Sequence, residues 1–341
     1  MIAELKTRIL NNTEQLHAIA NQWIALLQRC PAATPFQRPE WVISWAEIFS
    51  PECIRVVEVR VGNMLIGLAP LLIYSRGQER VLAFMAGGIS DYLDLLIDPQ
   101  YENEVMAAIL QAIEGLECWT TLDFTDLPAN SALHRSTLAQ FAIPHDRCSS
   151  LFVPSSRDTL LQYFSKRQRA NLRQARSRIQ KAGGCLETST QQNANECLQD
   201  LFRLHTKRWL RDGQPGVLDD EEVMLFHRNV VPSLHAAGVL RFHRLRIGGE
   251  TVAVMYTLHT RSTVFCYLQG YDPAFAALSP GTYLMFWVME QAILAGVTKF
   301  ELLRGEEAYK QHWRAECEVT LRIRSCRTFE GICHRLESAA A

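Results

Sequence analysis

Charged and phenolic side chains gather directly after an apolar strand in the segment KFELLRGEEAYKQHW, residues 299–313. The strand is predicted to end at Leu303, and the residues that follow it include Arg304, Glu306, Tyr309 and Lys310. Open α/β sheets bind ligands at the carboxyl ends of their strands, so this segment is a candidate for catalysis or substrate binding. A plain solvent-exposed surface is the alternative interpretation.

The segment LSPGTYLMFWVMEQAILAG, residues 278–296, predicts a helix whose start suits an anion. Ser279 is a typical N-cap residue, and Pro280 suits the first turn, where its missing N–H costs nothing. Gly281 places no side chain where a ligand would approach. With Thr282, these residues present backbone N–H groups and the positive end of the helix dipole, which favour a pyrophosphate. A well-capped core helix is the alternative.

A third segment, KRQRANLRQARSRIQK at residues 166–181, holds seven basic residues and no acidic one. Helical periodicity places four of the cations on one face: Lys166, Arg169, Arg173 and Arg176. Leu172, Ala175 and Ile179 form the predicted buried stripe. The face is either simply solvated or attracts an anionic ligand or RNA phosphates. No aromatic residues are interleaved to stack on bases, which weakens the RNA interpretation.

A fourth segment, HTKRWLRDGQPG at residues 205–216, joins a helix end to a loop rich in glycine and proline. His205 and Trp209 are one helical turn apart, and Arg208 lies beside them. A helix followed by a mobile loop can form a lid over a substrate. A structural helix end is the equal alternative.

The elements that must position these residues occur twice along the chain. Residues 54–61 and 239–247 each precede a glycine-containing turn and a second apolar run, and each pair predicts a β-hairpin. A further strand, a helix (102–114 or 281–295) and a last strand (119–124 or 299–303) follow each hairpin. The repeated order predicts an α/β protein with mixed sheets and two copies of one fold, in domains 1–145 and 150–341.

Composition agrees with a two-domain globular protein of 341 residues and net charge −1. No apolar run is long enough to cross a bilayer and no signal peptide is recognisable, so we expect a cytoplasmic protein without a transmembrane segment. The ten cysteines include no C-x-x-C pair. We therefore expect no metal site.

Taken together, these motifs resemble a known family. The strings SKRQRANLR, HTKRW, GYDP, SPG and ELLRGEEAYKQHW, with FQRPEWVISWAEIF and ISDYLDLLID, are similar to the CelD/BcsL group of GNAT acetyltransferase-like proteins, named for cellulose biosynthesis loci. The resemblance implies two tandem GNAT-like domains. It also implies transfer of an acyl group from acetyl-CoA or another acyl-CoA to an amine or hydroxyl acceptor, in exopolysaccharide or cell-envelope metabolism.

The resemblance also implies roles for individual residues. Residues 279–282 are expected to bind the acyl-CoA, in the second domain alone, because no Ser-Pro-Gly precedes the helix at Glu102. The family's Q/R-x-x-G-x-G/A loop is matched only in part. Tyr309 is expected to protonate the departing thiolate. The candidate general bases are Glu306, Asp272 and His205, in that order.

Five residues are expected to assist Tyr309 or to hold the acceptor. Arg304 or Lys310 would help Tyr309 or bind the acceptor, and His205, Arg208 and Trp209 would line the acceptor site.

Two alternatives remain open at this stage. The basic helix favours an aminoacyl-tRNA-dependent transferase, as in the more distant FemAB-like relatives, although near-zero net charge makes nucleic acid an unlikely partner. The other alternative is a non-catalytic member of a polysaccharide biosynthesis machinery. The expected partners are a saccharide or small amine acceptor and other proteins of such a machinery.

Overall fold

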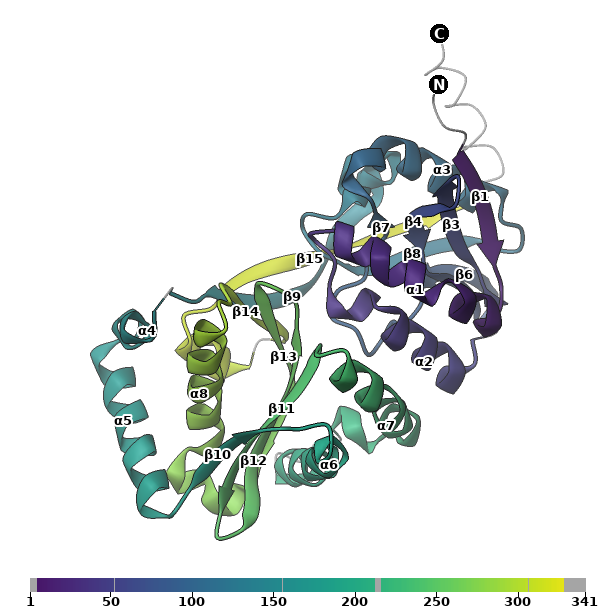
Figure 1. The fold of residues 1–341 in the computed structure, drawn as a ribbon. Coiled ribbons are helices and arrows are strands. Elements are labelled where there is room, and N and C mark those ends of the chain that lie inside the picture. The colour runs from purple at the N-terminus through teal and green to yellow at the C-terminus, as the bar shows by residue number, and fades with distance from the viewer. Residues whose placement is uncertain (1–4, 52, 155, 212–215, 306, 328–341) are drawn as a thin grey trace. The chain divides into compact units, whose positions relative to one another are not determined.

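The computed structural model describes residues 5–51, 53–154, 156–211, 216–305 and 307–327. The chain forms two compact units (Figure 1). Unit 1 contains Met1–Asp146 and Val319–Ala341, and unit 2 contains Arg147–Glu318. Among the described residues no helix is both long and apolar enough to cross a membrane.

Unit 1 holds two groups of strands and three α-helices. One sheet has the order β1-β3-β4-β7, and a second group has the order β8-β6-β5-β2. The strands are β1 (Leu5–Leu10), β2 (Cys53–Ile54), β3 (Val56–Val61), β4 (Met64–Ala69), β5 (Leu71–Arg76), β6 (Glu79–Phe84), β7 (Leu96–Ile97) and β8 (Thr121–Leu127). The helices are α1 (Thr13–Arg29), α2 (Pro39–Phe49) and α3 (Glu102–Gly115).

The apolar run at residues 64–74, predicted as one strand, forms two. β4 pairs with β3, whereas β5 pairs with β6 in the other group of strands. Pro70 separates them, because proline has no N–H to donate to a continuing ladder. The proline thus converts one hydrophobic run into the link between two sheets.

Unit 2 is a mixed sheet with helices on both faces. Its strand order is β10-β11-β12-β13-β14-β9. The strands are β9 (Ala142–Phe152), β10 (Cys185–Thr188), β11 (Leu240–Ile247), β12 (Glu250–His259), β13 (Thr263–Tyr271) and β14 (Lys299–Arg304). The helices are α4 (Arg157–Tyr163), α5 (Lys166–Lys181), α6 (Ala194–Arg211), α7 (Glu221–Ala236), α8 (Pro280–Leu294) and α9 (Ala308–His312).

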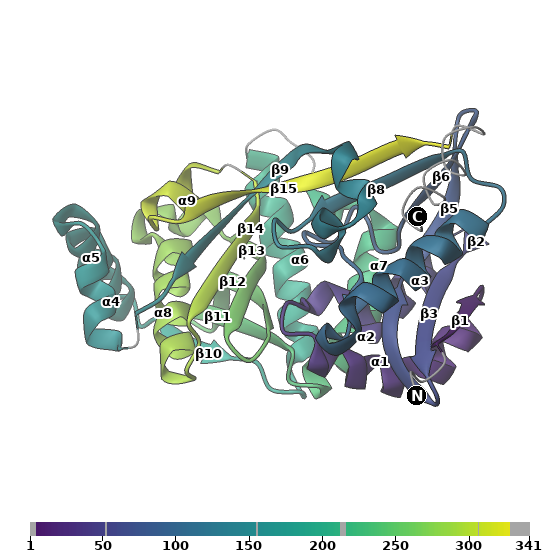
Figure 2. The ribbon, with the colours of Figure 1, turned by 90° about the horizontal axis from the view of Figure 1, so that it is seen from above.

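The two faces of the unit 2 sheet are covered differently. Met255 of β12 is buried in a core that α8 completes, while the next residue, Tyr256, contacts His227 of α7 on the opposite face. Helix α6 lies directly on β13, since a Cβ at Gly270 would come within 2.7 Å of the His205 backbone nitrogen. Helices α4 and α5 pack against α8 and form an outer layer (Figures 1 and 2).

The two units repeat one order of elements, which confirms the predicted duplication. In each, a strand, two helices and a hairpin (β1-α1-α2-β3-β4 and β10-α6-α7-β11-β12) precede a strand, a helix and a strand (β6-α3-β8 and β13-α8-β14). Unit 1 has β2, β5 and β7 in addition. The strand before that helix runs parallel to the strand after it: β6 pairs with β8, and β13 pairs with β14. The repeat therefore includes a strand and two helices before each hairpin, which the sequence pattern did not indicate. The fold is of the α/β class, and one arrangement of elements is repeated in the two units.

The division of the chain differs from the predicted boundaries at the C-terminal end. Strand β15 (Glu316–Cys326) leaves unit 2, and its residues Leu321–Cys326 pair with β8 of unit 1. The segment from Val319 therefore belongs to unit 1 rather than to a domain 150–341. In return, Cys148–Phe152 of β9 pairs with β14 of unit 2. An edge strand exposes unpaired backbone groups, and each exchanged strand satisfies such an edge.

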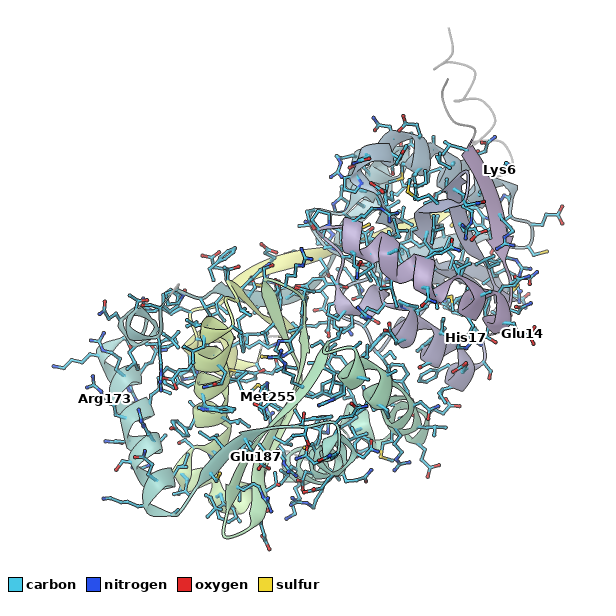
Figure 3. The ribbon with its side chains drawn as sticks, in the orientation of Figure 1. Lys6, Glu14, His17, Arg173, Glu187 and Met255 are labelled. Atoms are coloured by element: carbon cyan, nitrogen blue, oxygen red, sulfur yellow. The ribbon has the colours of Figure 1, made fainter. Side chains whose placement is uncertain are left out.

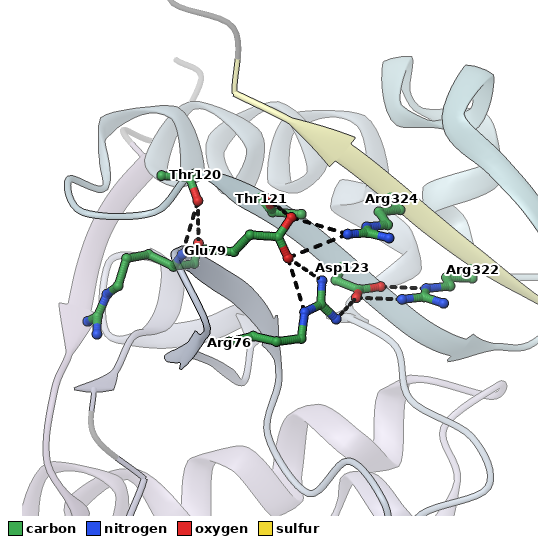
Figure 4. Close-up of polar contacts among 8 residues, drawn as sticks. Arg76, Glu79, Thr120, Thr121, Asp123, Arg322 and Arg324 are labelled. Carbon is green, nitrogen blue, oxygen red and sulfur yellow. Dashed lines mark hydrogen bonds and ion pairs between the residues drawn. The ribbon is translucent and has the colours of Figure 1, made fainter.

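Ion pairs fix β15 against β8 within unit 1 (Figure 4). Arg322 contacts both carboxylate oxygens of Asp123, each at 2.6 Å, and Arg76 reaches the same carboxylate at 3.0 Å. The Asp123 side chain is only 4 % exposed, so its charge depends on these partners.

Candidate functional site

Strands β13 and β14 separate along their length, and a cavity lies in unit 2 beside the end of β13. Their parallel pairing is confined to Thr263–Phe265 and Lys299–Glu301. The register between β13 and β12 changes at a bulge in β13. Cys266 pairs with Thr257 and Leu268 pairs with Tyr256, so that Tyr267 between them has no partner in β12. Beyond this bulge, Gln269 and Tyr271 line a cavity of about 570 Å³.

Four predicted residues, Ser279 to Thr282, line this cavity at the start of α8. Ser279 differs from the prediction in one respect: its side chain makes no capping hydrogen bond, because its backbone is left-handed (φ 54°) rather than extended. The first intrahelical bond runs from the Tyr283 N–H to the Ser279 carbonyl at 3.1 Å. Pro280 has no N–H, so the first turn leaves the N–H groups of Gly281 and Thr282 without helical acceptors.

Neither the backbone conformation at Gly281 nor the packing around it requires a glycine at this position. Its φ is not positive, and a Cβ placed there would meet Tyr271 Cδ1 at 3.6 Å, an ordinary contact. The space beside it opens into the cavity. The missing side chain therefore leaves room for a ligand close to the helix start.

Two arginines add positive charge to the same cavity. Arg178 of α5 lines it and donates to the Ala277 carbonyl at 3.0 Å, just before α8. Arg208 of α6 also lines it, with its guanidinium 5.8 Å from the centre of the Tyr271 ring. A helix N-terminus with two guanidinium groups nearby is an environment that favours phosphate.

Tyr309 lines the cavity from α9, in line with its predicted position near the chemistry. Burial raises the pKa of its phenol well above the usual value, the negative charge of Glu307 adds to the rise, and a hydrogen bond with the Gln269 side chain opposes it. The phenol therefore stays protonated throughout the physiological range. It can donate a hydrogen bond into the cavity.

Lys310 is turned away from the role predicted for it. Its ammonium donates to the carbonyls of Leu303, Arg304 and Gly305 at 3.0, 2.5 and 3.1 Å and pairs with Glu307 at 2.9 Å. Leu303 and Gly305 both have positive φ, so the chain curls around this ammonium at the end of β14. Lys310 thus stabilises the strand end.

Asp272 and His205 do not line the cavity. The Asp272 carboxylate accepts from Lys207 Nζ at 2.8 Å, and this contact lowers its pKa. His205 lies in α6, and the residue is only 3 % exposed. Burial, together with the positive charge of the nearby Arg208, lowers the pKa of the His205 imidazole to about 4. Neither residue is brought to the place where an acceptor would be deprotonated, and Arg304 does not line the cavity either.

Two predicted residues are beyond what the structure describes. Glu306 lies outside the described residues. Trp209 lies in α6, but its side chain is outside the described part as well.

Gln269, Arg178 and His312 are among the cavity residues that were not singled out from the sequence. His312 follows Tyr309 by three residues on α9, so the two side chains lie on neighbouring positions of one helix face. The Gln168 side chain donates to the His312 backbone carbonyl and ties α5 to α9. The three-residue spacing of Tyr309 and His312 was the signal available in the sequence, but the sequence-based prediction considered Glu306 and Lys310 as the partners of Tyr309 instead.

Comparison with known proteins agrees with this geometry. Residues 166–311 match the family model described as an acetyltransferase (GNAT) domain. Most of unit 2 is therefore similar to an acetyltransferase (GNAT) domain. The match runs from the start of α5 into α9 and includes most of the cavity lining, but it leaves out Phe164, His312 and Trp313. No curated protein matches the chain.

Solved structures share the two-domain fold over almost the whole chain. FemX is 13 % identical with a TM-score of 0.66, covering 93 % of this chain and 97 % of its own. A protein of unknown function from Bacteroides thetaiotaomicron is 14 % identical with a TM-score of 0.62, covering 94 % and 100 %. L-PGS from Bacillus licheniformis is 14 % identical with a TM-score of 0.55, covering 93 % of each chain. At this level of identity, these likenesses concern the fold alone.

Proposed function

We propose that this protein is an acyltransferase that binds acetyl-CoA or another acyl-CoA in the unit 2 cavity and passes the acyl group to an amine or hydroxyl acceptor. The observation that supports it best is the start of α8, where Gly281 and Thr282, in the turn before the first intrahelical hydrogen bond, line a cavity that Arg178 and Arg208 also line. The pyrophosphate of coenzyme A fits this combination of dipole, backbone donors and cations.

Unit 1 lacks the corresponding features, which supports placing the donor in unit 2 alone. Its equivalent helix, α3, carries Glu102 and Glu104 in the first turn. Asp98, just before it, is buried and pairs with Arg29 at 2.6 Å. Carboxylates at a helix start favour the helix but repel an anion, so this end is a structural cap rather than a phosphate site.

In the reaction, the acceptor nitrogen or oxygen bonds to the thioester carbonyl carbon, the carbon–sulfur bond breaks, and the sulfur leaves as a thiolate. Tyr309 is placed to stabilise the charge that develops on the sulfur. Because its pKa lies above that of a thiol near 8.5, complete proton transfer from the phenol is unfavourable. Tyr309 therefore acts as a hydrogen-bond donor, and the thiolate takes its final proton from His312 or water.

The acceptor must lose a proton as it attacks. His312 is the described imidazole in the cavity lining, and histidine is the commonest general base in enzymes. We assign it this role in place of Asp272 and His205, which lie away from the cavity. Glu306 stays a prediction from the sequence.

The test is release of free thiol from acetyl-CoA by the full chain, with panels of amines, amino sugars and saccharides as acceptors. The saccharides are included because the family resemblance points to polysaccharide or envelope metabolism. The proposal expects release that saturates with acetyl-CoA and depends on one acceptor class. Deacylation of aminoacyl-tRNA with no use of any acyl-CoA would establish the tRNA-dependent alternative, and binding without turnover would indicate a non-catalytic protein.

A further inference from the structure

Helix α5 carries a row of cations that the donor cavity does not use. Its cavity side is formed by Gln168, Asn171, Gln174 and Arg178. The basic stripe, defined as Lys166, Arg169, Arg173 and Arg176, lies about 180° away around the helix at 100° per residue. The stripe therefore faces away from the acyl donor, and Figure 3 shows Arg173 pointing outward from α5.

The basic stripe opposes the stability of the helix that carries it. Lys166 and Arg169 lie in or beside the first turn, which holds no acidic residue, so they meet the positive end of the dipole. Successive members are three or four residues apart, the spacing at which like charges repel. The fold itself does not require this arrangement, because Leu172, Ala175 and Ile179 supply the packing of α5.

The cations of the stripe are also available to a partner. Lys166, Arg173 and Arg176 are exposed, and within the described ranges no carboxylate pairs with them. Only Arg169 is half-buried, where it donates to the Phe164 carbonyl at 3.2 Å. Since the whole chain has a net charge of −1, this positive surface is a local feature.

We propose that the basic stripe docks the protein on a membrane surface rich in anionic phospholipids. Helix α5 belongs to the outer layer of unit 2 (Figures 1 and 2). Its stripe of long, flexible cations suits a plane of anionic headgroups. The exposed residues of α5 include no large apolar side chain to insert, so binding is electrostatic and reversible.

RNA fits this surface less well for two reasons. No aromatic side chain is interleaved with the stripe to stack on bases. An acylated RNA held on the stripe would also lie on the opposite side of α5 from the cavity. The docking proposal does not depend on acyl-CoA being the donor. An experiment can therefore contradict the docking proposal without contradicting the proposed function, and the reverse also holds.

Vesicle sedimentation with the full chain tests this proposal. The vesicles are phosphatidylcholine alone or with about a third phosphatidylglycerol, at low and physiological salt. The test variant combines Lys166→Gln, Arg173→Gln and Arg176→Gln, which keep good helix formers. The matched control combines Lys6→Gln, Arg241→Gln and Arg261→Gln, which remove three exposed charges elsewhere. Circular dichroism confirms that both variants are folded.

We expect the protein to bind only the anionic vesicles, and salt should weaken this binding. Each stripe charge removed should lower the affinity for the vesicles by about fivefold. The control triple variant should bind with nearly wild-type affinity. Equal loss in both triples would overturn a specific surface. So would the absence of binding to anionic vesicles. Stripe-dependent binding of a labelled duplex RNA with no vesicle binding would reassign the surface to nucleic acid.

Discussion

Tyr309 illustrates how the environment of one residue defines its chemistry. A tyrosine after the last strand of unit 2 was expected to hand its proton to the leaving thiolate. In the folded protein, burial and Glu307 raise the pKa of the phenol, so that it remains a hydrogen-bond donor instead. Position was thus predictable from the sequence, whereas the protonation behaviour required the neighbours that folding brings together.

Replacing Tyr309 with phenylalanine should lower kcat by about tenfold to a hundredfold, because a donor to the developing charge is lost. KM for the acyl donor should change little, as expected for an interaction made mainly in the transition state. Steady-state thiol release measures both. Tyr163→Phe is the control, since its hydroxyl lies at an exposed contact with the Arg314 carbonyl. A lower melting temperature with normal turnover would instead show that Tyr309 is structural.

Asp94 in unit 1 gives a pH-dependent prediction at the same scale. Burial raises the pKa of this carboxyl to about 7, although Ser131 Oγ and the Leu95 N–H donate to it, each at 2.8 Å. Because the folded pKa exceeds the unfolded value near 3.9, the stability contributed by Asp94 is present at low pH and is lost as pH rises toward 7.

Asp94→Asn should therefore raise the free energy of unfolding at pH 8, by on the order of 3 kcal/mol, and leave it nearly unchanged at pH 4. Asparagine keeps the oxygen that accepts both hydrogen bonds. Urea unfolding at the two pH values measures the difference. The same effect at both pH values would mean that ionisation of Asp94 is not the cause.

At the scale of elements, some predictions depended only on local pattern and others on distant partners. Helix α5 begins and ends where the sequence predicted, with Leu172, Ala175 and Ile179 buried, because helical periodicity and the Ser165–Gln168 capping box are local signals. The left-handed backbone of Ser279 was missed, since it follows from the turn that joins a short 3-10 helix, Pro273–Leu278, to α8. The exchange of β9 and β15 was also missed, because strand pairing has no local signature.

The contact of β15 with β8 should contribute strongly to the stability of unit 1. Arg322→Met leaves the buried Asp123 with one arginine fewer and should cost about 2–4 kcal/mol of unfolding free energy. Arg324→Met, on the same strand, removes only a half-exposed pair with Glu79 at 3.2 Å and should cost clearly less unfolding free energy than Arg322→Met. Urea unfolding followed by circular dichroism compares them.

The sign of the pH dependence gives a second check on this pair. Burial alone would raise the pKa of Asp123, but hydrogen bonds from Arg322 and Arg76 outweigh it and hold the pKa below its usual value. The stabilisation is therefore present at neutral pH and is lost as the carboxyl protonates in acid. Equal costs for the Arg322 and Arg324 variants at pH 7 would contradict the assigned role of β15.

At the scale of the whole molecule, the two copies of the fold differ at the start of the equivalent helices α3 and α8. In unit 2, Ser279–Thr282 open into a cavity lined by arginines, whereas in unit 1 acidic residues occupy the equivalent position. Sequence could locate both copies from the repeated order of elements, and it could distinguish their helix starts from residue types alone. It could not show which side chains of α5, α6 and α9 close the cavity, because those helices are far apart along the chain.

The most direct test of the account is calorimetric titration of acetyl-CoA into the wild type and Gly281→Val. Packing around Gly281 tolerates a Cβ, so the variant should unfold at nearly the wild-type temperature. A valine beside the exposed N–H groups should nevertheless weaken acetyl-CoA binding by tenfold or more, at about 1.4 kcal/mol for each factor of ten. Equal affinity of the two proteins for acetyl-CoA, or no binding by either, would contradict the proposed donor site.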